Sequence, residues 1–137
     1  MSNDDQTIAA QFNTEILNKV NSPATHIEIF YQGKDLSYSK NELPLKLGRD
    51  DTVCDLVVDS ELASRVHCAI EVRDNQIGLM DSSTNGTFLN IGRNESFVVK
   101  RTFYPLIGKG NISLGEPFGE DDSHIIYYRM VTKKEQA

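Results

Sequence analysis

The sequence of 137 residues has no long hydrophobic run, few cysteines and little basic charge. Its apolar runs extend over a few residues, whereas a membrane-spanning helix needs about 20, so we expect no membrane partner. The N-terminus has neither a basic region nor an apolar stretch, so we predict no secretory signal. The two cysteines, Cys54 and Cys68, form no CxxC motif. Two such thiols without a signal peptide favour the reducing cytoplasm over a disulfide-rich secreted protein.

The shortage of basic residues excludes several classes of partner. The chain has 14 Lys and Arg residues against 20 Asp and Glu, a net charge of −6. This balance argues against non-specific binding to nucleic acid or anionic lipid. The three histidines are scattered without the spacing of metal ligands, so we predict no metal and no cofactor. Hydrophobic residues make up 39% of the chain, which is enough for the core of one domain.

Residues 1–25 carry a helical pattern. Apolar residues recur at spacings of three and four, namely Ile8, Ala9, Phe12, Ile16, Leu17 and Val20. Asn21-Ser22-Pro23 ends the pattern. We predict one N-terminal amphipathic helix and linker over residues 1–25, a domain over 26–131 and a C-terminal tail over 132–137. Three roles are open for the helix: docking on the domain itself, dimerisation or partner binding, or a frayed tail.

From residue 26 onward the hydrophobic period changes to two. Alternating or short apolar runs occupy residues 27–31, 43–47, 68–72, 77–79, 97–99, 112–114 and 125–131. Turn signals separate these runs at residues 32–34, 73–75, 84–86 and 108–110, the last being Gly-Lys-Gly. The run 125–131 is apolar on both faces, which predicts a strand inside a sheet. Short strands at roughly ten-residue spacing predict an all-β antiparallel sandwich or barrel.

Polar residues collect at the ends of three predicted strands. Gly48-Arg49 follows the run 43–47, Ser64-Arg65-Val66-His67 precedes 68–72, and residues 81–87 follow 77–80. Arginine forks, hydroxyls and backbone N–H groups are the donors that hold a phosphate, so these residues suggest a phosphate site. Strand counting places the loops of Ser64 and Asn85 at one end. Arg49 reaches that end only if the connection 50–55 crosses over instead of forming a hairpin.

The three blocks together resemble the signature of forkhead-associated (FHA) domains. They are Gly48-Arg49, Ser64-Arg65-x-His67 and Asn85-Gly86-Thr87-Phe88-Leu89-Asn90, in the family's order and at the family's separations. The resemblance covers about residues 26–131. It implies a sandwich of about eleven strands that binds phosphothreonine in partner proteins through loops at one end.

The resemblance also implies a role for each residue of the site. Arg49 is the expected main phosphate ligand, Ser64 donates its hydroxyl to the phosphate, and Arg65 adds a second contact. Thr84 contributes a contact near the phosphate, and Asn85 hydrogen-bonds the backbone of the peptide. In isolation, Asn85 could equally be only the turn residue of an Asn-Gly pair.

Three further residues are expected to support the site. Gly48 and Gly86 meet backbone requirements of tight turns. We interpret His67 as a buried hydrogen-bonding brace for the loops.

The sequence therefore predicts a cytoplasmic phosphothreonine-recognition module without catalysis, which recruits proteins phosphorylated by Ser/Thr kinases in signalling. Acidic residues around Arg49 and Ser64 predict a preference for peptides that are not acidic near the phosphothreonine. One alternative is a phosphate-independent interaction or oligomerisation domain that self-associates through the N-terminal helix. A second alternative is a small hydrolase at Asp122, Ser123 and His124, which is disfavoured because adjacent strand residues point to opposite faces. A third is one piece of a larger signalling protein.

Overall fold

The computed structural model describes residues 24–93 and 95–133, and its regular structure is built almost entirely of strands. The strands, in chain order, are β1 (His26–Tyr31), β2 (Lys34–Ser39), β3 (Leu45–Gly48), β4 (Leu56–Val57), β5 (Cys68–Arg73), β6 (Gln76–Asp81), β7 (Thr87–Ile91), β8 (Phe97–Val99), β9 (Phe103–Pro105), β10 (Lys109–Leu114) and β11 (Ile126–Val131). A single 3₁₀ turn, η1 (Lys40–Glu42), lies between β2 and β3. The prediction of an all-β fold of about eleven strands is confirmed. The helix expected within residues 1–25 lies outside the described residues.

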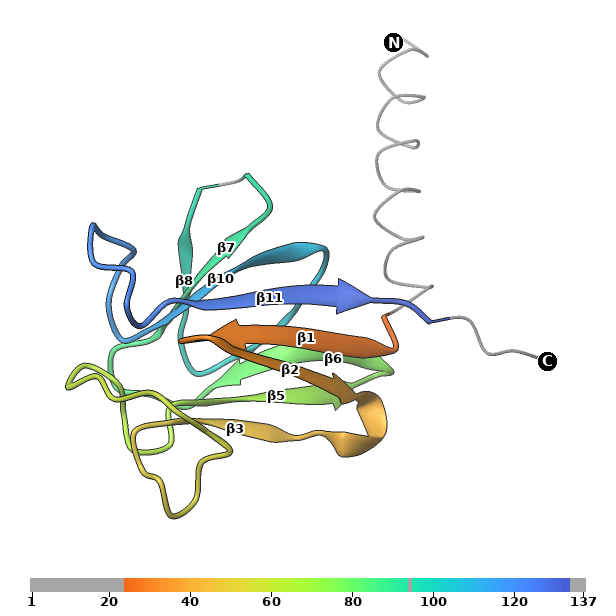
Figure 1. Cartoon of the computed structure of the whole chain (residues 1–137), viewed down its shortest axis with the longest axis horizontal. Coiled ribbons are helices and arrows are strands. Elements are labelled where there is room, and N and C mark those ends of the chain that lie inside the picture. Colours follow the sequence, from red (N-terminus) through yellow and green to blue (C-terminus); the bar gives the residue numbers. More distant parts are fainter. Residues whose placement is uncertain (1–23, 94, 134–137) are drawn as a thin grey trace, which may run out of the picture.

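The strands form two sheets that pack face to face (Figure 1). One sheet has six strands in the order β2-β1-β11-β10-β7-β8, and the other has five in the order β4-β3-β5-β6-β9. Alternate side chains of both sheets point inward and form one core, as the period of two requires. The fully buried apolar members of the core include Ile27, Ile29, Leu47, Ile70, Leu79, Leu89, Ile112 and Ile126.

One pair of neighbouring strands departs from the antiparallel pattern. β3 and β4 run parallel, with Leu47 opposite Leu56 and Gly48 opposite Val57. A parallel pair cannot be joined by a tight hairpin, so the connection between these strands crosses from one end of the sheet to the other. This is the crossover that the strand count required for Arg49. The sandwich is therefore mixed at this edge and antiparallel elsewhere.

Two local predictions are corrected by the fold. β3 begins at Leu45 and not at Leu43, because Pro44 has no N–H to donate to a neighbouring strand. The predicted turn Gly108-Lys109-Gly110 is wrong at its last two residues, which belong to β10. A side chain at Gly110 would collide with the carbonyl of Asn90, so this glycine permits close strand contact and does not make a turn.

The last strand lies where the sequence predicts it. β11 lies between β1 and β10, so its predicted position inside a sheet is confirmed. Its two faces nevertheless differ, because Ile126 and Tyr128 are buried whereas Tyr127 and Arg129 are exposed. An apolar or aromatic side chain can stand on a solvent-facing side of a sheet, and hydropathy alone does not separate the two cases.

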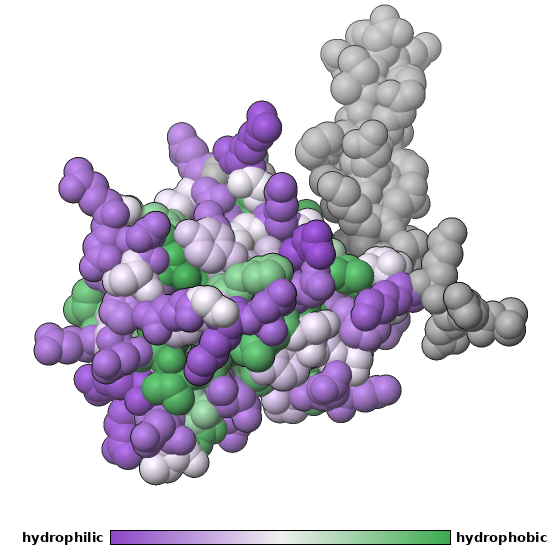
Figure 2. Space-filling model, in the orientation of Figure 1, coloured by the Kyte–Doolittle hydropathy of each residue, from purple (hydrophilic) through white to green (hydrophobic). Residues whose placement is uncertain are grey.

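The surface between the loops is mixed in character. Figure 2 shows hydrophilic side chains projecting over much of the face in view, with hydrophobic side chains between them. None of the helices that residues 24–93 and 95–133 form is long and apolar enough to cross a membrane.

Candidate functional site

The three polar blocks of the sequence meet at one end of the sandwich, where β3 and β6 end and β5 and β7 begin (Figure 1). The backbone N–H of Arg49 donates to the carbonyl of Ser64 at 3.0 Å, and the N–H of Asp50 donates to the carbonyl of Arg65 at 3.0 Å. The N–H of Thr84 donates to the Ser64 hydroxyl oxygen at 3.2 Å. Two backbone hydrogen bonds and one hydrogen bond to a side chain thus bring together segments that lie up to 35 positions apart.

Gly48 makes the first of these approaches possible. A Cβ at this position would collide with the carbonyl oxygen of Arg65 and would lie 2.8 Å from the backbone nitrogen of His67. Both are backbone atoms, which cannot rotate away. The absence of a side chain therefore lets the end of β3 lie directly against the segment that precedes β5.

Gly86 has a different requirement. Its φ is +89°, a conformation that residues with a side chain rarely adopt. A side chain there would also collide with Val98. Asn85, the preceding residue, does not have a positive φ, so the Asn-Gly pair is not the two-residue turn that has positive φ at both positions.

His67 connects two of the loops from a fully buried position. The backbone N–H of Ser64 donates to Nδ1 at 2.9 Å, so Nδ1 carries no proton. Nε2 lies 2.8 Å from the carbonyl oxygen of Gly86 and must donate its hydrogen to it. Burial lowers the pKa of His67 below its usual value, against smaller opposing effects of the Gly86 hydrogen bond and the Asp81 charge. The ring is therefore neutral and in one tautomer.

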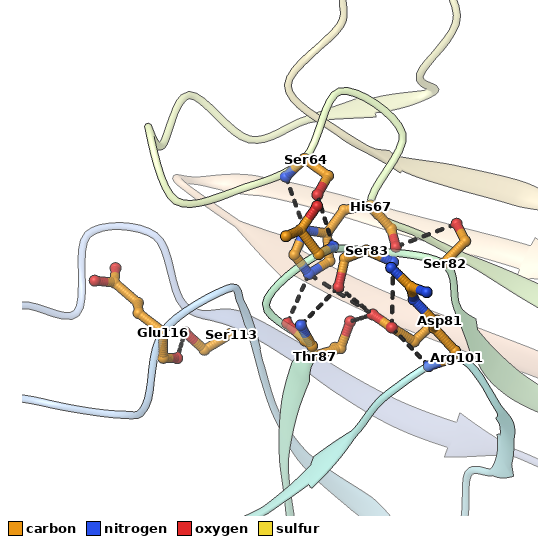
Figure 3. A network of polar contacts seen from close by, with 11 residues as sticks. Ser64, His67, Asp81, Ser82, Ser83, Thr87, Arg101, Ser113 and Glu116 are labelled. Carbon is orange, nitrogen blue, oxygen red and sulfur yellow. Dashed lines mark hydrogen bonds and ion pairs between the residues drawn. The ribbon is translucent and has the colours of Figure 1, made fainter.

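Asp81 is the centre of a second buried network (Figure 3). Its carboxylate accepts hydrogen bonds from the hydroxyls of Ser83 and Thr87, both at 2.7 Å, and from the backbone N–H of Arg101 at 2.9 Å. The Ser83 hydroxyl oxygen in turn accepts from the N–H of Gly86 at 2.8 Å. Although burial acts to raise it, these hydrogen bonds together hold the pKa of Asp81 below its usual value. The ionised carboxylate fixes the shape of the loop between β6 and β7.

Arg49 and Asn85 stand apart from both networks. Both residues are exposed, and in the described part of the chain neither side chain makes a hydrogen bond or an ion pair. An arginine without a carboxylate partner keeps all five guanidinium hydrogens available to a ligand. Thr84 is exposed as well, and its hydroxyl makes no hydrogen bond within the described residues.

Arg65 differs from Arg49 because its guanidinium already has a partner. It lies 3.2 Å from a carboxylate oxygen of Asp50. Hydrogen bonds from Thr52 lower the pKa of Asp50, and the contact with Arg65 lowers it further. A ligand would have to draw Arg65 away from this carboxylate, so this position is weaker as a phosphate donor than the sequence pattern indicates.

The donors at this end suit an oxyanion. Ser64 accepts one hydrogen bond at its oxygen, from the N–H of Thr84, and keeps its own hydroxyl hydrogen free to donate. Within the described residues, the loops at this end therefore carry one guanidinium, two hydroxyls and one side-chain amide whose hydrogens are not used by the protein itself. Such a set can bind a phosphate and the polar backbone beside it.

Sequence reasoning missed two members of the site's support. Asp81 and Ser83 were counted only as loop residues, whereas both are buried and hydrogen-bonded to the loop. A signal was present, since an Asp at a strand end with a Ser two positions later is typical of a side chain that caps its own turn. The hydroxyl of Thr87 donates to the same carboxylate of Asp81.

The fold and the site define a β-sandwich that presents unpaired hydrogen-bond donors on loops at one end. The family model for the FHA domain matches residues 45–104, which include all three polar blocks. Solved structures that the fold resembles include FHA domains. The resemblance to FHA domains inferred from the sequence is thus confirmed over residues 45–104.

Three of these structures illustrate the likeness. The first FHA domain of Rv1747 from Mycobacterium tuberculosis is 19% identical, with a TM-score of 0.59 over 79% of this chain and 98% of that one. The N-terminal FHA domain of Rad53p from S. cerevisiae, in complex with a phosphothreonine peptide, is 22% identical, with a TM-score of 0.55 over 78% and 93%. The MEK1 FHA domain, in complex with the HOP1 pThr318 peptide, is 24% identical, with a TM-score of 0.59 over 76% and 95%. No curated protein matches this chain.

Proposed function

We propose that this FHA domain binds phosphothreonine peptides in partner proteins and so recruits substrates of Ser/Thr kinases. The observation that carries the proposal is the exposed guanidinium of Arg49, which has no partner in the described part of the chain and is joined through its backbone to Ser64. Two of the similar FHA domains were solved with phosphothreonine peptides, which supports a ligand of this chemistry.

Each residue of the proposed site has a role that fits its contacts. Arg49 binds two phosphate oxygens through its fork, and Ser64 donates its free hydroxyl hydrogen to a third. Thr84 adds its hydroxyl, because its N–H is already used by Ser64. Asn85 donates to and accepts from the peptide backbone. Arg65 joins the phosphate only by leaving Asp50.

Three other residues are proposed to support the site. Gly48 lets β3 approach the Ser64 loop, Gly86 provides the turn with positive φ, and His67 ties the two loops through its ring nitrogens. None of these three residues is required to contact the ligand. Binding by this site needs no cofactor and no catalytic step, and we propose that it takes place in the cytoplasm.

The charges around the site predict which peptides bind well. Asp50 and Asp59 lie in the connections that flank Arg49 and Ser64, as do Asp51 and Glu61, and Asp51, Asp59 and Glu61 are exposed. Such carboxylates repel acidic residues next to the phosphothreonine. We therefore expect peptides with neutral or basic flanking residues to bind more tightly than acidic ones.

The test is binding of a phosphothreonine peptide library, beside phosphoserine and unphosphorylated versions, by fluorescence anisotropy. A charge-assisted hydrogen bond contributes about 1.5–3 kcal/mol, so Arg49→Ala should weaken binding by about tenfold or more. Arg93→Ala is the matched control, because Arg93 is exposed and lies in the turn after β7, away from Gly86. Binding should strengthen as the pH rises through about 6, the second pKa of a phosphothreonine.

Two results would overturn the proposal. One is equal affinity for phosphorylated and unphosphorylated peptides, which would favour a phosphate-independent interaction domain on the same fold. The other is phosphopeptide binding that Arg49→Ala and Arg93→Ala reduce equally, because the site would then lie elsewhere on the domain.

A further inference from the structure

The outer face of the six-stranded sheet carries an aromatic pair that the proposed phosphopeptide site does not use. Phe30 of β1 and Tyr127 of β11 are opposite each other across the two strands. Their neighbours Ile29 and Tyr128 are buried, whereas Phe30 is 37% exposed and Tyr127 44% exposed. The pair therefore faces away from the core, on a broad and nearly central part of the sheet.

A hollow of about 360 Å³ lies beside this pair. Its lining includes Phe30, Tyr127, Lys109, Arg129, Asn111 and Gly92. Gly92 has no side chain to fill the space, and nothing would obstruct one there. The hollow is apolar on the side of the aromatic rings and cationic on the side of Lys109 and Arg129.

The two cations differ in their partners. Arg129 forms an ion pair with Glu28, its neighbour on β1. Lys109 is exposed, and its ammonium has no carboxylate partner among residues 24–93 and 95–133. The face thus offers exposed aromatic surface together with an unneutralised positive charge, which suits an occupant that is apolar on one side and acidic at its edge.

The chain itself carries a segment of this chemistry. Residues 8–20 contain the apolar stripe of Ile8, Ala9, Phe12, Ile16, Leu17 and Val20, and their charged residues are Glu15 and Lys19; two further acidic residues, Asp4 and Asp5, precede them. We propose that this segment, as an amphipathic helix, packs its stripe on the Phe30–Tyr127 face of its own domain. The occupant is thus a part of the same chain, and the surface is distinct from the loops that hold Arg49.

The point of attachment places the segment within reach. The N–H of Thr25 donates to the carbonyl of Val131 at 2.9 Å, and the N–H of Lys133 donates to the Thr25 hydroxyl at 2.9 Å. These bonds fix the start of β1 beside the end of β11. The distance from Thr25 to Phe30 along β1 is about 17 Å at 3.3 Å per residue.

The lengths on both sides of the attachment agree. A helix over residues 8–20 is about 18 Å long at 1.5 Å per residue. The five residue-to-residue steps from Val20 to Thr25 extend up to about 17 Å, which is enough for the segment to fold back along β1 and β11. A tether this short holds the segment at an effective concentration in the millimolar range, which favours the same chain over a second copy.

The experiment uses the full chain labelled with ¹⁵N. Ile16→Asp places a charge at the centre of the stripe, and Asn18→Asp places the same charge on the opposite side of the helix. We expect Ile16→Asp to shift the backbone amide signals of Lys109, Asn111, Tyr127 and Arg129. Asn18→Asp should leave these signals in place, and both variants should leave the signals of Leu79 in the other sheet unchanged.

A reciprocal variant tests the face. Tyr127→Ser should shift the amide signals of residues 8–20, whereas Val98→Ser, a change at an exposed residue of the edge strand β8, should not. Unchanged face signals in Ile16→Asp would overturn the proposal, as would equal shifts in Ile16→Asp and Asn18→Asp. A change in the face signals of the unmodified chain on tenfold dilution would also overturn the proposal, because the occupant of the face would then be a second copy.

Discussion

Removal of the two ring nitrogens of His67 is the most informative perturbation of the site's support. His67→Phe keeps a planar ring at a fully buried position but withdraws the acceptor of the Ser64 N–H and the donor to the Gly86 carbonyl. A backbone group left without its partner costs about 1–3 kcal/mol when buried. Since the Ser64 N–H is only part-buried, we expect the free energy of unfolding to fall by about 2–4 kcal/mol.

Urea unfolding followed by circular dichroism measures this loss, and peptide anisotropy measures the effect on binding. His67→Gln is the matched variant, because an amide can both accept and donate, and it should lose less stability than His67→Phe. In His67→Phe, binding of a phosphothreonine peptide should weaken at a temperature where the domain is still folded. A stability loss below about 0.5 kcal/mol, with unchanged affinity, would refute the bracing role of the ring.

The same histidine gives the stability a pH dependence of known sign. The pKa of His67 lies below its value of about 6.5 in the unfolded chain. The neutral ring therefore contributes its full stabilisation above pH 6.5, and this contribution is lost as the pH falls toward the folded pKa, with a slope of at most about 1.4 kcal/mol per pH unit. Unfolding curves between pH 7.5 and 5 should show this loss in the natural chain and not in His67→Gln. An equal pH dependence of stability in the natural chain and in His67→Gln would contradict the assignment of this loss to His67.

Three further outcomes follow from contacts around the site. Gly48→Ala should lower the free energy of unfolding by about 1–3 kcal/mol, measured by urea titration, because its Cβ meets backbone atoms of Arg65 and His67; a neutral effect would mean that the two segments can separate. Asp81→Asn should lower the free energy of unfolding by about 1–3 kcal/mol, because an amide replaces a carboxylate that accepts four hydrogen bonds. An unchanged melting temperature in a thermal melt would contradict this expectation. Asp50→Asn removes the ion pair of Arg65 and should tighten binding of a peptide with acidic flanking residues about two- to fivefold; weaker binding of that peptide would contradict the expectation.

Much of the fold could be predicted from the sequence, because strands and turns depend mainly on residues that are close together in the chain. Strand residues alternate between core and solvent, so Ile27 and Ile29, or Leu45 and Leu47, mark their strands by spacing alone. Turn residues with positive φ, such as Asp74 and Asn75, marked the hairpin between β5 and β6. Where a glycine serves close packing instead of a turn, as at Gly110, the local pattern misled.

For the candidate site, the sequence predicted only which residues take part. The order of Gly48, Arg49, Ser64, His67 and Asn85 in the sequence pointed to the family, and the family model confirms that resemblance over residues 45–104. The types of these residues do not show which of their hydrogen-bond donors lack a partner within the protein. That depends on partners far along the chain, and the phosphate-binding roles of the residues remain proposals.

The sequence by itself determined the period of the strands, the residues at their ends and the excess of negative charge. Only the tertiary structure decided that β3 and β4 run parallel and that Tyr127 faces solvent. It also decided that Asp50 forms an ion pair with Arg65, whereas the Arg49 side chain has no partner in the described part of the chain. The physical reason is that alternation and turn chemistry act between neighbours, whereas strand pairing, ion pairing and burial depend on which distant segments meet. Asp81 shows the same division, since its carboxylate is isolated in the sequence and fixes a whole loop in the fold.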